Sequence, residues 1–298
     1  MVTGAAGYIG GAIAGQLVKN GFSVRGGVRA DCALPSRITK LITGDLAATR
    51  VDLAGLDAVV HAAGLGHRRG VPPAVWRSAN VDAAVNMARL AKAAGVRRFV
   101  LISTAHVHGR VHPAIVSDDT PPNPMDDYAA SKLEAERAVA EIFGEGLSIL
   151  RPVAVIGPHC PGNLQLLMKL LDRGVPLPFG AIANRRSFID VADLARLVQS
   201  VLQAPVAPGI VLAASPDAIA TPKLIQALAE GMGVRPKLFA VAPSILAAGA
   251  KLLGRAAMWQ SLAGSFVASP QAALRLGWAP AESLQKSLIK TARAYVVS

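Results

Sequence analysis

The predicted fold is decided by the stretch Val2-Thr3-Gly4-Ala5-Ala6-Gly7-Tyr8-Ile9-Gly10. Its order is a strand end, a glycine turn and the start of a helix. Glycine lets the backbone approach a pyrophosphate, where a Cβ atom would block it. The helix then presents free N–H groups and the positive end of its dipole to the phosphates. An ordinary glycine-rich turn is the competing interpretation, but the helical pattern and the strand that follow favour a dinucleotide site formed by Gly4, Gly7, Tyr8, Ile9 and Gly10.

Downstream of this turn, apolar runs of strand length alternate with helical patterns. Glycine follows two of the expected helices, at Gly21 and Gly95, where it commonly ends a helix. Continuous apolar strands between helices predict a parallel sheet covered on both faces, in a Rossmann-type doubly wound α/β fold. The expected strands are 22–28, 58–62, 98–103 and 147–152, and the expected helices are 9–19, 79–94 and 128–143.

The texture changes after residue 151, where prolines interrupt any long element. Further helices are expected to begin near Asp190 and to cover 282–295. We therefore predict an NAD(P)-binding Rossmann domain over 1–155 and a smaller, mainly substrate-binding lobe over 156–298. The segment 190–214 is expected to return to the Rossmann domain.

Composition indicates a globular protein. The 298 residues include 52% hydrophobic and 17% charged residues, which suits a packed core rather than a disordered chain. Two distant cysteines, Cys32 and Cys160, form no disulfide framework and predict a cytoplasmic location. The formal net charge of +12 attracts anions. Because the arginines are scattered, we expect anionic cofactors and substrates and no nucleic acid.

Three apolar segments are candidates for contact with a membrane. The run 1–18 has no preceding basic stretch and contains turn glycines, so it is not interpreted as a signal peptide. The uncharged run 197–216 is broken by prolines and a glycine, which favours a helix, a turn and a strand over an integral membrane segment. The basic, apolar segment 243–255 could attach to a membrane surface, but a helix packed on the core is favoured.

The residues after the second strand bear on the choice of cofactor. An acidic residue there holds the ribose 2′-hydroxyl of NAD, and Val24-Arg25-Gly26-Gly27-Val28-Arg29 contains none. The guanidinium of Arg29 suits a 2′-phosphate, which slightly favours NADP over NAD. The alternative for Arg29 is a solvated surface arginine. Asp31 lies near enough to contact the ribose, so NAD remains open.

Two more segments are candidates for cofactor contact. Asp45 and Leu46 follow another strand-like run, where the carboxylate could reach the adenine or, equally, cap a helix. The segment His61-Ala62-Ala63-Gly64 lies at the carboxyl end of a strand, where ligands gather in such folds.

The segment Tyr128-Ala129-Ala130-Ser131-Lys132 places Tyr128 and Lys132 one helical turn apart on one face. A nearby ammonium stabilises a phenolate, so we expect it to lower the pKa of Tyr128 towards neutrality. Thr104 ends the preceding strand, where its hydroxyl could contact the same substrate oxygen. These three residues are the predicted catalytic set.

With these motifs the sequence resembles the extended short-chain dehydrogenases/reductases, and specifically the NAD-dependent epimerase/dehydratase family. The resemblance covers nearly the whole chain, and its later motifs are similar to the nucleotide-sugar 4-epimerase/4-ketoreductase branch. It rests on TGAAGYIG from Thr3, Asp45, HAAG at 61–64, Asn80, Ser103-Thr104-Ala105, Tyr128 with Lys132, Leu150-Arg151-Pro152, RSFIDV from Arg186 and LGWAP from Leu276.

The resemblance implies a role for each matched residue. Thr104 and Tyr128 would contact the reacting hydroxyl or ketone of the sugar, while Lys132 holds the nicotinamide ribose. Asn80 and Ser103 join the cofactor-binding set. Arg186 would approach the diphosphate or base of the sugar nucleotide, with Asn163 as its neighbour. The family also makes a homodimer through helices 79–94 and 128–143 possible.

Departures from the family pattern narrow the chemistry. Residues 1–3 alone precede Gly4, which points to an internal start or a frayed first strand. Sugar dehydratases carry Asp-Glu directly after the catalytic Thr, and this chain has Ala105-His106, so dehydration is excluded. The usual Val-Tyr-Gly is Val107-His108-Gly109. No metal site is expected, because His106, His108 and His112 lack a carboxylate or cysteine partner.

The favoured function is reduction of a 4-keto nucleotide-diphosphate sugar. The substrate would be a UDP-4-keto-6-deoxy-hexose or N-acetylhexosamine used for surface polysaccharides. The C-terminal half of the chain resembles reductases and epimerases of bacterial surface-polysaccharide pathways. One alternative is a UDP-glucose or UDP-N-acetylglucosamine 4-epimerase with tightly bound NAD, which would not need Arg29. Another is a non-catalytic dinucleotide sensor, disfavoured because Tyr128 and Lys132 are both retained.

Overall fold

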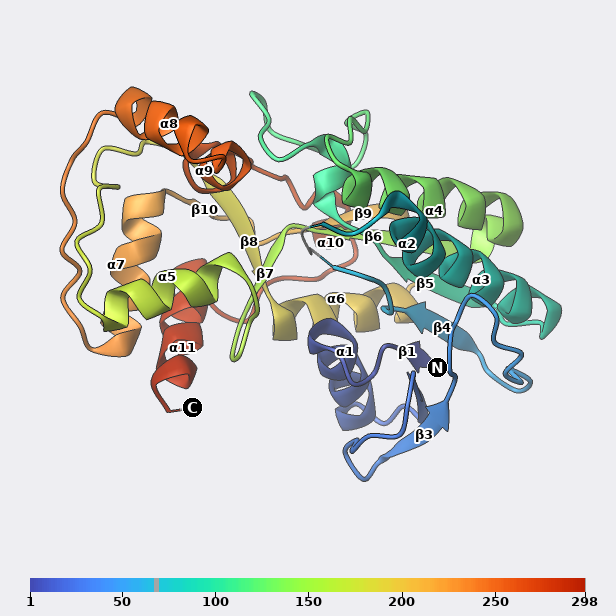
Figure 1. Cartoon of the computed structure of the whole chain (residues 1–298). Coiled ribbons are helices and arrows are strands. Elements are labelled where there is room, and N and C mark those ends of the chain that lie inside the picture. Colours follow the sequence, from blue (N-terminus) through green and yellow to red (C-terminus); the bar gives the residue numbers. More distant parts are fainter. Residues whose placement is uncertain (67–69, 298) are drawn as a thin grey trace.

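A parallel sheet of seven strands forms the centre of the computed structural model, which describes residues 1–66 and 70–297. Its strand order is β3-β2-β1-β4-β5-β6-β9 (Figure 1). The order reverses between β1 and β4, which is where open parallel sheets bind ligands. The predicted Rossmann-type fold is thereby confirmed. The strands are β1 Val2–Thr3, β2 Val24–Val28, β3 Ile38–Ile42, β4 Ala58–His61, β5 Arg98–Ile102, β6 Leu147–Pro152 and β9 Gly209–Ala213.

Helices cover both faces of this sheet, as predicted from the continuous apolar strands. Helices α1 (Tyr8–Lys19) and α6 (Val191–Gln203) pack against each other on one face. Helices α3 (Ala83–Ala93) and α4 (Asp127–Phe143) cover the other. Alternate strand residues enter opposite cores, because successive side chains of a strand point to opposite faces: Val100 joins the α1 side and Phe99 the α4 side.

The expected helix 79–94 is split into different helical geometries. A short α2 (Pro73–Trp76) leads into a π-helical turn, η1 (Arg77–Asp82), before α3 begins. The hydrophobic periodicity of the sequence could not reveal this turn, because it has no strong sequence signature. Turns of this kind are frequent at functional sites. The effect of η1 is to bury the side chain of Asn80.

A second, smaller sheet organises the C-terminal lobe, with the order β10-β8-β7. Its strands are β7 Ala154–Ile156, β8 Arg186–Asp190 and β10 Ala218–Ile219. Three helices bury a separate apolar core with it, namely α5 (Asn163–Asp172), α7 (Thr221–Met232) and α11 (Leu284–Val296). The remaining elements are α8 Pro243–Leu252, α9 Ala256–Ala263, α10 Gln271–Arg275 and the 3₁₀ turns η2 Ala105–His108 and η3 Gly144–Gly146.

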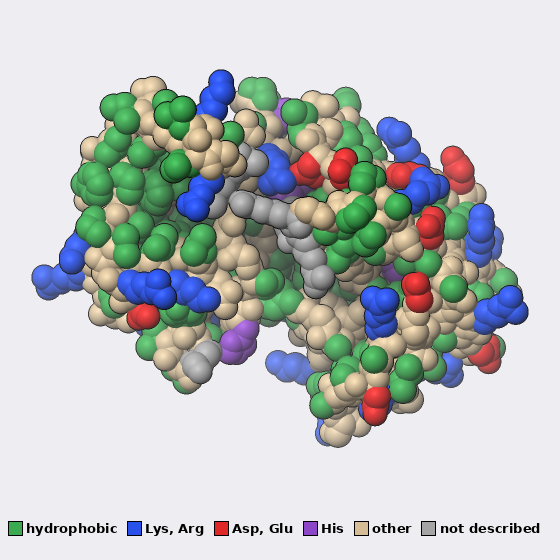
Figure 2. Space-filling model, viewed as in Figure 1, with side chains coloured by type: hydrophobic (Ala, Val, Ile, Leu, Met, Phe, Trp, Pro, Cys, Tyr) green, Lys and Arg blue, Asp and Glu red, His purple; other side chains and the backbone are tan. Residues whose placement is uncertain are grey.

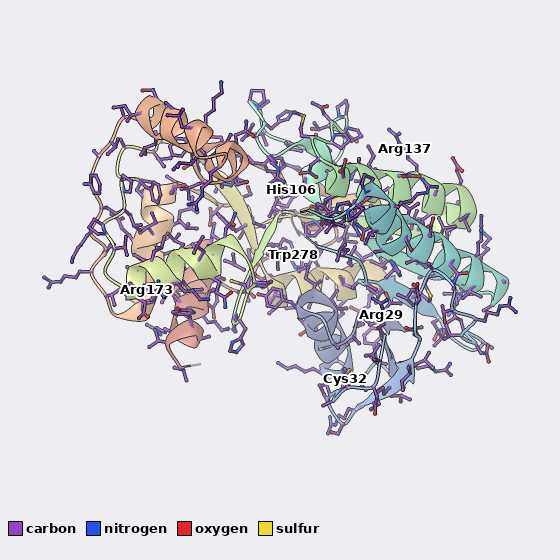
Figure 3. All side chains as sticks on the ribbon, in the orientation of Figure 1. Arg29, Cys32, His106, Arg137, Arg173 and Trp278 are labelled. Carbon is purple, nitrogen blue, oxygen red and sulfur yellow. The ribbon has the colours of Figure 1, made fainter. Side chains whose placement is uncertain are left out.

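The chain crosses between the two sheets more than once. Helix α6 follows β8 directly, and β9 pairs with β6 at the edge of the main sheet. The buried Trp278 donates from Nε1 to the carbonyl of Asp193, 3.0 Å away, which fastens the C-terminal segment to α6 (Figure 3). We propose 1–155 with 190–214 as one Rossmann domain and the rest as the substrate-binding lobe.

The segment expected to pack on the core does not do so. A helix forms there, as α8, but it contains no buried residue and belongs to none of the apolar cores. The prediction of a core-packed helix over 243–255 is therefore wrong. In the described part of the chain, no helix is both long and apolar enough to cross a bilayer.

Candidate active site

The glycine turn after β1 is a tightly built cradle. Gly4 has a φ of 68°, and a Cβ atom on it would lie 3.0 Å from the backbone of Ala63. A Cβ atom on Gly10 would lie 2.2 Å from the carbonyl oxygen of Gly4. Gly7 precedes α1 without a side-chain cap, so the first N–H groups of the helix stay available to an anion. The cradle therefore fits the pyrophosphate of a dinucleotide.

Substituting Gly10 by alanine tests how closely the helix must approach the turn. We expect Gly10→Ala to cost about 1–3 kcal/mol in the free energy of unfolding, because backbone must move to admit the Cβ atom. We also expect weaker NADPH binding, measured by fluorescence titration. Gly15→Ala is the matched control, because nothing lies within 4 Å of its added Cβ atom, and it should stabilise the same helix by roughly 0.5–1 kcal/mol. Equal effects of both substitutions would contradict the cradle.

The remaining predicted residues near the turn place apolar side chains in the cores. Ile9 and Ala62 pack against the core on the α1 side, and Leu46 packs against the other core. The hydroxyl of Tyr8 is buried against Gly157, and this burial raises the pKa of the phenol. These side chains are only partly buried, so their contact with a cofactor stays a prediction.

Charged side chains surround the end of β2. Arg29 follows this strand directly and is exposed (Figure 3). Asp31 is held by Lys40 of β3, and this hydrogen bond lowers the pKa of the Asp31 carboxyl. Asp45 accepts a hydrogen bond from the backbone of Ala47 at 3.1 Å, so it caps a turn rather than a helix. Arg29 is thus an exposed cation directly after β2, and its contact with a 2′-phosphate stays a prediction.

His61 has a structural position at the end of β4. Its ring Nδ1 lies 3.1 Å from the hydroxyl oxygen of Thr3, which in turn accepts a hydrogen bond from the backbone of Ala63 at 3.1 Å. Burial, together with the charge of Lys132, lowers the pKa of His61 to about 3. The ring is therefore neutral and ties β4 to β1 beside the glycine turn.

Asn80 connects the loop after β4 to helix α4. Its Oδ1 accepts from the backbone of Leu65 at 2.8 Å, and its Nδ2 donates to the hydroxyl of Ser131 at 3.0 Å. A Cβ atom on Gly64 would lie 2.8 Å from the same Oδ1. The π-helical turn η1 thus positions Asn80 to hold the predicted cofactor loop against α4.

The predicted catalytic residues meet at the carboxyl end of β5. Thr104 is buried and caps η2, with its hydroxyl accepting from the backbone of His106 at 3.2 Å. Tyr128 lies in the first turn of α4 and shares a hydrogen bond with Thr104. The ring of Trp76 packs on Tyr128 with centroids 5.6 Å apart. This contact of Trp76 could not be predicted from the sequence, because it depends on the position of α2.

Burial sets the proton affinities of the pair on α4. The Nζ of Lys132 donates to the carbonyl of Ile102 at 2.7 Å, and burial lowers the pKa of this lysine to about 8 against the opposing effect of Glu136. Burial raises the pKa of Tyr128, and the hydrogen bond with Thr104 opposes that rise. The expected pKa of Tyr128 near neutrality is therefore wrong here, because desolvation of the phenolate dominates. At neutral pH, Tyr128 is a phenol with a proton to give.

A buried ionic network lies behind this pair and was not predicted. Glu136, one turn after Lys132, accepts from the guanidinium of Arg151 at 2.6 Å and from the hydroxyl of Ser103. Arg151 also donates to Nε2 of His108 at 3.1 Å. Burial and the charge of Arg151 lower the pKa of His108 to about 4, so the ring is neutral. The hydroxyl of Ser103 thus belongs to this network, and contact of Ser103 with a cofactor stays a prediction.

Arg186 is connected to helix α4 through Arg110 and Asp126. It begins β8, and its Nη1 donates to the carbonyl of Gly264 at 3.0 Å. Burial and the neighbouring Arg110 lower its pKa to about 10. Arg110 pairs at 2.6 Å with Asp126, whose carboxylate caps α4.

The predicted role of Asn163 at the substrate stays a prediction. This residue is exposed at the first position of α5, and no hydrogen bond of the described chain joins it to Arg186 or Lys132. His106 lies in η2 (Figure 3). Among residues 1–66 and 70–297, no group of three His, Cys, Asp or Glu side chains is placed to hold a metal ion.

Known proteins share both the sequence pattern and the fold. The NAD dependent epimerase/dehydratase family model matches residues 1–213. The UDP-glucose 4-epimerase of Vibrio cholerae is 29% identical over 312 aligned positions, covering 99% of this chain and 95% of that protein. The ceramide reductase of Caulobacter vibrioides is 31% identical over 257 positions, or 84% and 75% of the two chains. The solved structure of MoeE5 in complex with UDP-glucuronic acid and NAD has a TM-score of 0.78 at 25% identity, covering 98% and 97%. The chain therefore belongs to the NAD dependent epimerase/dehydratase family.

Proposed function

We propose that this chain is an NAD(P)-dependent enzyme that reduces the 4-keto group of a nucleotide-diphosphate sugar. The observation that carries the proposal is the meeting of Thr104, Tyr128 and Lys132 at the end of β5. A glycine cradle for a pyrophosphate opens at the same edge of the sheet. The V. cholerae relative, named for UDP-glucose, and MoeE5, solved with UDP-glucuronic acid and NAD, support a UDP-sugar substrate.

Each residue of the site has a task in this reaction. The turn from Gly4 to Gly10 would hold the pyrophosphate of the cofactor, and Lys132 would hold the nicotinamide ribose. When bound, the nicotinamide supplies the hydride. Thr104 orients the substrate carbonyl by donating a hydrogen bond, and Tyr128 donates its phenolic proton to the carbonyl oxygen. The ammonium of Lys132 stabilises the phenolate that remains.

The same residues could also serve a 4-epimerase. The phenolate form of Tyr128 would then take the proton of a sugar hydroxyl while a bound nicotinamide would accept the hydride from the same carbon, and both would be returned after the ketone has turned over in the site. The V. cholerae relative supports this alternative, and the C. vibrioides relative, named as a reductase, supports the first. Arg29 favours the reductase, because a reductase consumes its cofactor and can use NADPH. The retained pair of Tyr128 and Lys132 argues against a non-catalytic dinucleotide sensor.

A direct assay separates these functions. Purified protein is mixed with a UDP-4-keto-6-deoxy sugar and NADPH, and nicotinamide absorbance is followed together with the sugar product. We expect one reduced sugar for each NADPH oxidised. If absorbance stays constant, UDP-glucose and UDP-N-acetylglucosamine are supplied without added cofactor, and interconversion at C4 would establish the epimerase. Inactivity in both assays would reject the nucleotide-sugar substrate class.

Arg29 is expected to select the phosphorylated cofactor. Arg29→Asp should lower the preference for NADPH over NADH by about 10–100-fold, because a charge-assisted contact with the 2′-phosphate is replaced by repulsion. The measurement is the ratio of kcat/KM for the two cofactors. Arg25→Asp, which makes the same charge change at the other end of β2, is the control. An unchanged ratio in Arg29→Asp would show that this arginine is a solvated surface residue.

A further inference from the structure

Helix α8 exposes apolar side chains that nothing in the described chain covers. Leu252 is 88% exposed, Leu253 72% and Ile245 65%. Their i, i+7 and i+8 spacing places them on one side of the helix. Scattered apolar side chains are ordinary on a protein surface, but two on this ten-residue helix and a third at its C-cap, Leu253, form a patch. Figure 2 shows hydrophobic side chains gathered over this part of the C-terminal lobe.

The stretch of chain that contains this patch carries charge of a single sign. No Asp or Glu occurs between Glu230 and Glu282, whereas five basic residues do: Arg235, Lys237, Lys251, Arg255 and Arg275. Lys251 and Arg255 are exposed and stand on either side of Leu252 and Leu253. Apolar side chains flanked by Lys and Arg are the pattern of helices that lie in the interface of an anionic bilayer.

We propose that α8 and the adjoining turn bind the surface of an anionic lipid bilayer. Ile245, Leu252 and Leu253 would enter the interface, while Lys251 and Arg255 contact lipid phosphates. A second copy of the chain is the competing occupant of the patch. A two-fold interface through this patch would bring Lys251 and Arg255 of both copies close together, and the segment between Glu230 and Glu282 offers no carboxylate to pair with them, which is unfavourable. The charge therefore selects the lipid.

The patch is attached to the wall of the candidate active site. Helix α9 follows α8, and the carbonyls at its end accept hydrogen bonds from the lobe core: Leu262 from Asn184 at 2.9 Å and Gly264 from Arg186 at 3.0 Å. Arg186 is the residue that the family resemblance predicts to approach the diphosphate or base of the sugar nucleotide. Binding through α8 would thus hold the substrate side of the enzyme close to the bilayer, whichever sugar reaction it performs (Figure 1).

Vesicle flotation of the whole chain tests the proposal. The wild type should float with vesicles of phosphatidylcholine and phosphatidylglycerol, float much less with phosphatidylcholine alone, and be released by high salt. Lys251→Gln with Arg255→Gln should weaken partitioning by about 30-fold, the loss of two contacts with an anionic surface. Leu252→Glu with Leu253→Glu should abolish flotation.

The controls separate lipid binding from misfolding and from self-association. Val206→Glu changes a side chain that is 73% exposed, far along the chain in the turn before β9, and should float like the wild type. All variants should keep the circular dichroism spectrum and NADPH affinity of the wild type. The proposal fails if the wild type does not float, or if Leu252→Glu with Leu253→Glu floats normally. It also fails if sedimentation shows a dimer that these leucine substitutions dissociate while flotation is absent.

Discussion

Tyr128→Phe is expected to lower kcat by about 10²–10⁴-fold, the usual contribution of a positioned acid or base. The phenolic hydroxyl is the group that shares a hydrogen bond with Thr104, while the ring packs on Trp76. Phenylalanine keeps that ring contact and removes the proton that the substrate oxygen must receive. Because one hydrogen bond contributes only about 0.5–1.5 kcal/mol, the fold should persist. Steady-state rates and denaturant unfolding of the same preparation check both expectations.

Tyr295→Phe is the control for this substitution. Tyr295 lies in α11, where it is partly buried against the core of the C-terminal lobe, and no described hydrogen bond or ring contact joins it to Thr104. Its variant should keep the wild-type kcat. If Tyr128→Phe retained both turnover and the wild-type pH profile, the proton would come from elsewhere, and the proposed role of Tyr128 would be lost. If Tyr128→Phe kept the biological activity and the wild type showed no turnover, the dinucleotide sensor would be favoured instead.

Local sequence patterns predicted what depends on local geometry. The glycine turn was predictable because Gly4 and Gly10 have no space for a Cβ atom. The pair of Tyr128 and Lys132 was predictable because a spacing of four residues fixes their positions on one helix. The centre of the sheet was predictable because β4, β5 and β6 are largely apolar and buried.

Contacts between segments that are distant in the sequence could not be predicted from local sequence patterns. Trp76 meets Tyr128 because α2 and the π-helical turn bring it there, and no period in the sequence signals that turn. The lowered pKa of Lys132 and the raised pKa of Tyr128 follow from burial, which a spacing rule does not contain. The exposed helix α8 was mispredicted for the converse reason. The apolar sequence of α8 suggests a helix that is buried in a core. Only the packing of the whole lobe shows that α8 is on the surface.

The network behind the catalytic pair should dominate the response of stability to mutation. Arg151→Met is expected to lower the free energy of unfolding by about 3–5 kcal/mol, because it leaves the carboxylate of Glu136 buried without its partner. Both side chains are almost fully buried, at 4% and 3% exposure, so water cannot replace the lost contact. The measurement is chemical denaturation at neutral pH.

A surface pair and a double substitution make this expectation specific to burial. Arg97 and Asp57 are also joined at 2.7 Å, but both are more than three-quarters exposed. Arg97→Met should therefore cost less than about 1 kcal/mol. Adding Glu136→Gln to Arg151→Met should recover part of the lost stability, because the unpaired charge is removed and the amide can still accept a hydrogen bond from Ser103. If the double variant were no more stable than Arg151→Met alone, lost packing of the arginine side chain would explain the cost better than a buried, unpaired carboxylate does.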